Sequence, residues 1–128
     1  MKIKTIFMTA IFATALPIAA YADLGTELGT AQTHAGLAAK GTTVDMVHMH
    51  LHHALNCLVG PKGKGFDTKN ENPCSGQGDG ALSDSKGAQK ARIRAAVVRV
   101  NAGLAATTLT KAQAGAVRAA TAITAAAK

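Results

Sequence analysis

The chain has 128 residues, enough for one small domain, and it carries a net charge of +7 with 48% hydrophobic residues. Only 3% of its residues are aromatic, so bases would find almost nothing to stack on, and we expect no nucleic-acid partner. Its Lys and Arg residues form no block of five or six like charges, which favours solvated helix faces over a basic tail.

Residues 1–22 have the pattern of a secretory signal peptide. A short basic start precedes an apolar run from Ile6 to Leu16, and Ala20-Tyr21-Ala22 fits a small-x-small cleavage site. A membrane-spanning helix needs about 20 apolar residues, and this run is shorter, so we expect cleavage rather than anchoring. The prediction is a periplasmic or secreted protein with one domain, residues 23–128, and no stable membrane insertion after cleavage.

Two cysteines, Cys57 and Cys74, follow the signal peptide. An even number of cysteines in an oxidising compartment favours a disulfide, because a free thiol pair tends to be oxidised there. The bond would close a short loop and contribute about 3 kcal/mol by restricting the unfolded chain. A thiolate metal ligand at Cys57 is the alternative interpretation.

The domain is rich in alanine and lacks alternating β-branched residues, so we predict an all-α fold, an antiparallel four-helix bundle. The spacing of apolar residues and caps predicts a helix from Leu24 to about Lys40, a second capped by Thr42 or Thr43 and ending near Val59, a third capped by Ser83 or Asp84, and a fourth that includes Leu109 and Ile123. Between the second and third helices we predict a long Gly/Pro-rich loop, residues 60–83, which the disulfide tethers.

Metal-binding side chains are concentrated in the second predicted helix. Four of the five histidines lie within six residues of one another, and methionines precede and interrupt them. The candidate ligands there are His48, His50, His52, His53, Met46 and Met49. Because imidazole and thioether groups bind borderline and soft transition metals, we predict a transition-metal site and favour copper.

On a helix with 100° per residue this stretch divides into two candidate binding faces. His48 and His52 lie one turn apart on one flank of the core stripe that includes Leu51. The far face collects Met46, Met49, His50 and His53. Side chains four residues apart can share one ligand, so both faces are candidates. His34, on the first helix, is a possible further ligand.

Two other functions fit the same residues. The first is non-covalent binding of haem b between helices with His48, His50, His52 or His53 as axial ligands, in a possible homodimer; no Cys-x-x-Cys-His motif for covalent attachment exists. The second is an interaction module whose Met/His face contacts a partner helix. No grouping of a base with a nucleophile stands out, so we do not expect an enzyme.

The His/Met-rich segment 46–57, the signal peptide and the helical pattern resemble the small periplasmic metal-binding helix-bundle proteins of proteobacteria. The resemblance implies a role in metal buffering, delivery or sensing. Those proteins spread histidines through every helix, whereas this chain concentrates them in one. This difference from the family favours one or two defined metal sites over high-capacity metal storage.

Overall fold

The computed structural model describes residues 23–128, and within them it contains five helices and no strand. The helices are α1 (Leu24–Ala39), α2 (Val44–Val59), α3 (Ala81–Asp84), α4 (Gly87–Leu104) and α5 (Leu109–Ala126). The prediction of an all-helical fold is confirmed. The predicted signal peptide lies outside the described residues. No helix in the described part is both long enough and apolar enough to cross a membrane.

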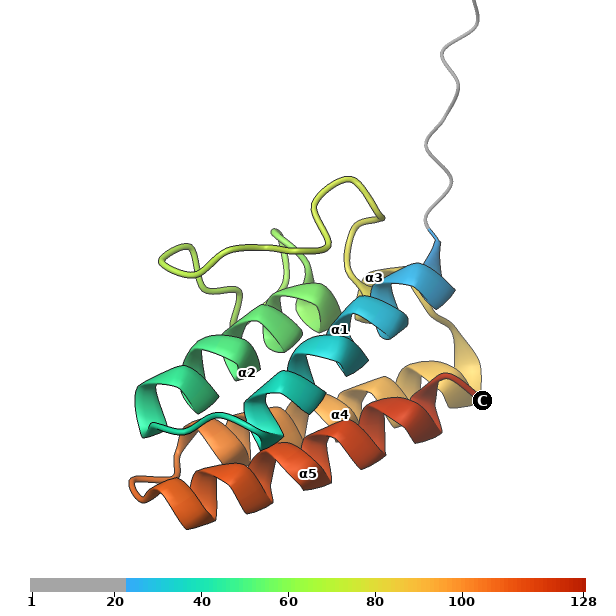
Figure 1. Cartoon of the computed structure of the whole chain (residues 1–128). Helices are drawn as coiled ribbons and strands as arrows, with labels where there is room; N and C mark the ends of the chain where they lie inside the picture. Colours follow the sequence, from blue (N-terminus) through green and yellow to red (C-terminus); the bar gives the residue numbers. More distant parts are fainter. Residues whose placement is uncertain (1–22) are drawn as a thin grey trace, which may run out of the picture.

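The four long helices form two hairpins, α1–α2 and α4–α5, each closed by a connection of four residues. The hairpins stack, with α5 in contact with α1 and α4 in contact with α2 (Figure 1). The predicted cap Thr43 begins α2 by accepting a hydrogen bond from the backbone N–H of Met46 at 3.1 Å. Asp23 caps α1 in the same way through the N–H of Thr26.

The third predicted helix is divided in two, which accounts for the fifth helix. We expected one helix from a cap at Ser83 or Asp84, but both residues lie in the single turn of α3. Ser85 then adopts an extended conformation, φ −98° and ψ 161°, and its hydroxyl donates to the carbonyl of Leu82. Since Lys86 is also extended, the long helix α4 begins only at Gly87. The irregular loop is therefore 60–80, not 60–83.

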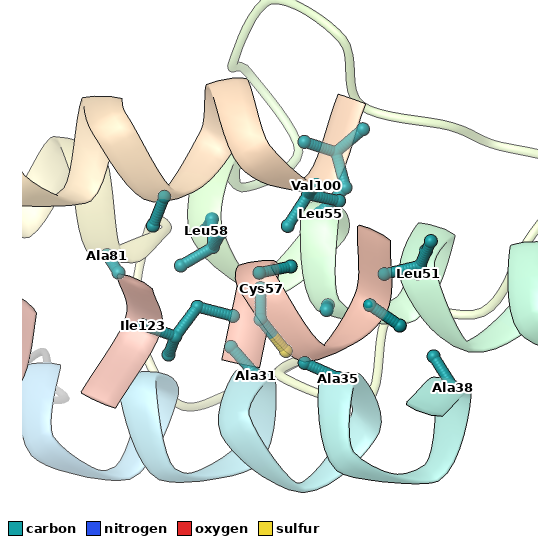
Figure 2. Close-up of a cluster of buried hydrophobic side chains, with 14 of the residues drawn as sticks. Ala31, Ala35, Ala38, Leu51, Leu55, Cys57, Leu58, Ala81, Val100 and Ile123 are labelled. Carbon is teal, nitrogen blue, oxygen red and sulfur yellow. The ribbon is translucent and has the colours of Figure 1, made fainter. Parts of the chain in front are cut away.

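The core is built from large side chains of three helices against alanines of α1. Leu51 and Leu58 from α2, Ile93 from α4 and Ile123 from α5 are fully buried. The side chains from α2 and α5 face a row of alanines on α1, consisting of Ala31, Ala35 and Ala38 (Figure 2). Small residues permit close approach of the helices but bury little area each, so the core contributes a modest stabilisation for its length.

The close approach is tightest where α4 meets α5. A Cβ atom on Gly115 would lie 2.6 Å from the Cα of Gly103. Only glycine at position 115 permits that separation, because real Cβ contacts are longer, and a Cβ on Gly103 would lie 2.8 Å from the Leu51 side chain. The glycines therefore set the distance between the two helices of the second hairpin.

The predicted disulfide is present. Cys57 on α2 is bonded to Cys74 in the loop, with 5.1 Å between their Cα atoms, and no cysteine in the described residues is free. The thiol of Cys57 is consequently not available as a metal ligand. The bond holds the loop against the α1–α2 hairpin, beside the histidines.

Candidate metal centre

Three histidine rings from two helices converge on one point at the α1–α2 hairpin. His34 comes from α1, and His50 and His53 come from α2. Nδ1 of His34 lies 3.3 Å from Nδ1 of His50 and 3.3 Å from Nδ1 of His53. One nitrogen from each ring can be chosen so that all three lie within 4.8 Å of one another. These three residues, the His cluster, can hold a metal ion.

The core stripe of α2 sets the direction of its histidines. Leu51 and Leu58 turn one side of the helix into the core, and His50 and His53 follow on the flank that faces α1. On α1 the buried Ala35 directly follows His34, which places the His34 ring at the edge of the same seam. The cluster is thus a consequence of how the two amphipathic helices pack.

Two of the nitrogen–nitrogen separations within the His cluster, both from His34, are those of imidazoles that share one ion. Two nitrogens each about 2.0–2.1 Å from a zinc ion, at a tetrahedral angle, are about 3.3 Å apart. His34 makes two contacts of that length. Without an ion its single Nδ1 can donate or accept only one conventional hydrogen bond, so one of the two neighbours is poorly paired. A cation at the centre satisfies all three nitrogens at once.

Burial favours the neutral, metal-binding form of two rings of the His cluster, those of His34 and His53, by lowering their pKa. Burial, followed by the neighbouring His53 and His50, lowers the pKa of His34 below its usual 6.5. The pKa of His53, whose side chain is only 8% exposed, is lowered by burial and then by His50. Metal ligands must be deprotonated, so these shifts extend the pH range over which the site is competent.

The charge of a loop residue, Glu71, acts on two rings of the His cluster. The charge of Glu71 opposes the lowering of the pKa of His34 and His53, so its field reaches both rings. Asn56, three residues after His53, fixes this part of the loop: its side-chain N–H₂ donates to the carbonyls of Asp67 at 2.9 Å and Glu71 at 3.0 Å. Its side-chain oxygen accepts from the N–H of Asp67 at 2.8 Å.

The other two histidines of α2 are engaged elsewhere and do not join the cluster. Nε2 of His48 lies 3.0 Å from the carbonyl of Ala106, in the connection between α4 and α5. Nδ1 of His52 lies 3.1 Å from a carboxylate oxygen of Asp67, an ion-pair distance without hydrogen-bond alignment. The structure therefore holds the His48 and His52 rings against different partners, although their spacing suits a shared ion.

The two methionines of the far face remain accessible. Met46 is 41% exposed and Met49 is 40% exposed. They precede His50 and His53 by one helical turn each, which places their thioethers on the same side of α2. They are candidates for additional soft ligands beside the cluster.

Comparison with known proteins gives no relative. No protein-family model matches this chain, and no curated protein or solved structure matches it significantly. The resemblance to periplasmic metal-binding helix-bundle proteins stays a prediction.

Sequence reasoning did not connect two residues of this region with the histidines. Asn56 is fully buried on α2, and a buried amide one turn after the histidines was the available signal for a loop anchor. Glu71 lies in an irregular segment without periodicity, so only the fold reveals that its charge acts on the His cluster.

Proposed function

We propose that this protein binds one transition-metal ion through His34, His50 and His53. The observation that carries the proposal is the convergence of three Nδ1 atoms from two helices at 3.3 Å contacts. Imidazole ligands suit zinc, copper, nickel and iron. An antiparallel four-helix bundle, as we interpret the two stacked hairpins, supplies ligands of this kind from facing helices.

Copper is the metal that the surrounding donors favour. Copper(II) binds imidazole sites more tightly than the other divalent first-row metals do, and copper(I) accepts thioether ligands. Met46 and Met49 offer accessible sulfur atoms one turn before the histidines. We propose buffering, delivery or sensing of copper in the periplasm, without catalysis; the disulfide is compatible with that compartment.

Haem is less well supported by this geometry. Axial haem ligands approach the iron from opposite sides of a macrocycle, whereas the three Nδ1 atoms point at one another. A cavity of about 330 Å³ within residues 23–128 is lined by α4 and α5 residues and by none of these histidines. Binding of haem b, a homodimer and a partner-helix interaction therefore stay the weaker hypotheses.

Titration of the purified protein with copper and zinc against a competing chelator tests the proposal. We expect one ion per chain, and His53→Gln should weaken binding by more than about 100-fold, since the loss of a residue that only supports a metal ligand already costs about 10–100-fold. The matched control is His48→Gln with His52→Gln, which removes two histidines of the same helix and should leave the affinity within a few-fold.

Three further outcomes decide between the alternatives. Met46→Leu with Met49→Leu should weaken copper(I) binding and spare zinc if thioethers complete the site. Loss of metal binding in the His48/His52 control but not in His53→Gln would contradict the assigned ligands. A Soret band in the protein purified from its host would replace the metal proposal by haem.

A further inference from the structure

The charges of this protein are divided sharply along the chain. All seven acidic residues lie at or before Asp84, whereas eight Lys and Arg residues and no acidic residue follow it. The basic residues that follow belong to the hairpin α4–α5 and its ends. Within residues 23–128 the single ion-pair contact joins His52 and Asp67, so every arginine of the hairpin lacks an acidic partner. One hairpin is therefore uniformly cationic.

The outer side of this hairpin combines those cations with exposed apolar side chains. Ile93 and Val100 turn α4 into the core, so Val98 lies on the opposite side, where it is 65% exposed. Ile123 sets the direction of α5 in the same way, and Val117 is 54% exposed. Both valines are therefore exposed on sides of their helices that are turned away from the core.

Two arginines flank a hollow on the same hairpin. An open cavity of about 330 Å³ is lined by Arg99 from α4 and by Arg118, Thr121, Ala122 and Ala125 from α5. Arg99 and Arg118 thus border one depression together with two alanines of α5. Two like charges brought together without a counter-charge are favourable only when an anion is near, because the repulsion is otherwise uncompensated.

We propose that the outer face of the α4–α5 hairpin is a docking surface for an anionic lipid bilayer. Lys and Arg residues near an anionic membrane each contribute to binding through the surface potential, and the exposed valines can enter the interface. Arg99 and Arg118 would bind lipid phosphates at the hollow. The scarcity of aromatic side chains argues against nucleic acid, because single-stranded nucleic acids are held largely by base stacking.

Docking by this face determines how the other hairpin is presented. The His cluster is built from α1 and α2, and the 60–80 loop lies on the far side of these helices from α5 (Figure 1). A protein bound through α4–α5 would hold the loop and the Met46 and Met49 side chains away from the bilayer. The proposed membrane-binding face of α4–α5 and the His cluster can therefore both be used by one molecule, because neither blocks the other.

Co-sedimentation with vesicles tests this surface. We expect the protein to bind vesicles of phosphatidylcholine with 30% phosphatidylglycerol, not pure phosphatidylcholine vesicles, and to dissociate as salt rises from 0.05 to 0.3 M, on the scale of Debye screening. Arg99→Ala with Arg118→Ala should weaken binding by about 30-fold. Lys62→Ala with Lys64→Ala is the matched control: it changes net charge equally, in the exposed loop, and should change binding less than about threefold.

A second pair of variants separates docking from simple charge attraction. Val98→Ser with Val117→Ser keeps the net charge and should still weaken vesicle binding several-fold. Val98, Arg99, Val117 and Arg118 are all exposed, so the variants should retain the far-UV circular dichroism spectrum of the parent. The parent and all variants carry the same N-terminus, so differences in vesicle binding come from the substitutions. If the two valine changes leave vesicle binding unaltered, or if the Lys62/Lys64 control loses as much as the arginine variant, the proposal is overturned.

Two competitors identify any other anion. Inorganic phosphate at constant ionic strength should not displace the vesicles; if it does, the hollow binds a free anion and the membrane proposal fails. Tighter binding to an oligonucleotide than to vesicles, lost in the arginine variant, would assign the face to nucleic acid instead. These measurements use metal-free protein, so their outcome is independent of the histidine site.

Discussion

The buried Glu27 makes the stability of the protein fall as pH rises, and Glu27→Gln should remove that dependence. Glu27 lies in the first turn of α1 and is fully buried. One of its carboxylate oxygens accepts the backbone N–H of Gly80 at 2.8 Å, and the other has no partner within the described residues. Burial above all, with the charge of Asp84 adding to it, raises the pKa of Glu27 from 4.5 to about 7.

The sign and size of the effect follow from proton linkage. Between pH 4.5 and about 7 the folded protein keeps a proton on Glu27 that the unfolded chain has released. The free energy of unfolding therefore decreases across this interval and levels off above it. The difference between the two pKa values corresponds to about 3 kcal/mol. A glutamine is neutral at every pH and can keep the acceptor for Gly80, so it avoids this loss.

Urea unfolding followed by circular dichroism at 222 nm, in chelator-treated buffers at pH 5 and pH 8, measures the effect. At each pH the quantity of interest is the free energy of unfolding of Glu27→Gln minus that of the parent. This difference should be about 2–3 kcal/mol larger at pH 8 than at pH 5. Comparing the two pH values cancels the packing cost of the substitution and the titration of the histidines. Asp84→Asn, which removes the neighbouring charge, should shift the transition to lower pH. An equal difference at both pH values would show that Glu27 ionises normally and refute the reasoning.

Three further predictions concern the metal site, the helix contact and the disulfide. Apparent copper affinity should stay nearly constant from pH 8 to about 6.5 and fall below it, because burial lowers the pKa of the two most buried rings of the His cluster; calorimetry across pH checks this. Gly115→Ala should lower the free energy of unfolding by about 1–3 kcal/mol, because the new Cβ would clash with α4. Gly29→Ala, where an added Cβ meets no neighbouring atom, should raise it by about 0.5–1 kcal/mol. Chemical denaturation measures both changes. Replacing Cys57 and Cys74 by serine should cost about 3 kcal/mol, given their separation of 17 residues, and unchanged stability in reductant would contradict it.

The long helices and the core face of α2 could be predicted from the sequence because each depends on local pattern. Thr43 is a cap by its side chain, and Leu51 and Leu58 recur at the helical period. The disulfide could be predicted because only two cysteines follow the signal peptide. The break at Ser85 could not, since serine is compatible with the first turns of a helix and the extended conformation depends on the surrounding loop.

The candidate site was predictable only as a choice between two faces of one helix. Periodicity separates His48 and His52 from His50 and His53, but both pairs have spacings that allow a shared ion. The decision depends on which flank of α2 faces α1, and that is set by the rotation of one helix against another. His34 acquires its place in the cluster from the same packing, which no single-helix argument contains.

The location of the His cluster ties metal occupancy to the stability of one hairpin. Its ligands come from both α1 and α2, whose packing rests on alanines that bury little area. An ion that binds only the folded hairpin stabilises it by about 2.7 kcal/mol when its concentration is 100 times the dissociation constant. For a small core this is a large increment. A bound metal ion would therefore stabilise the packing of α1 against α2 at one edge of the hairpin. The Cys57–Cys74 bond and the hydrogen bonds of Asn56 hold the loop against the same hairpin.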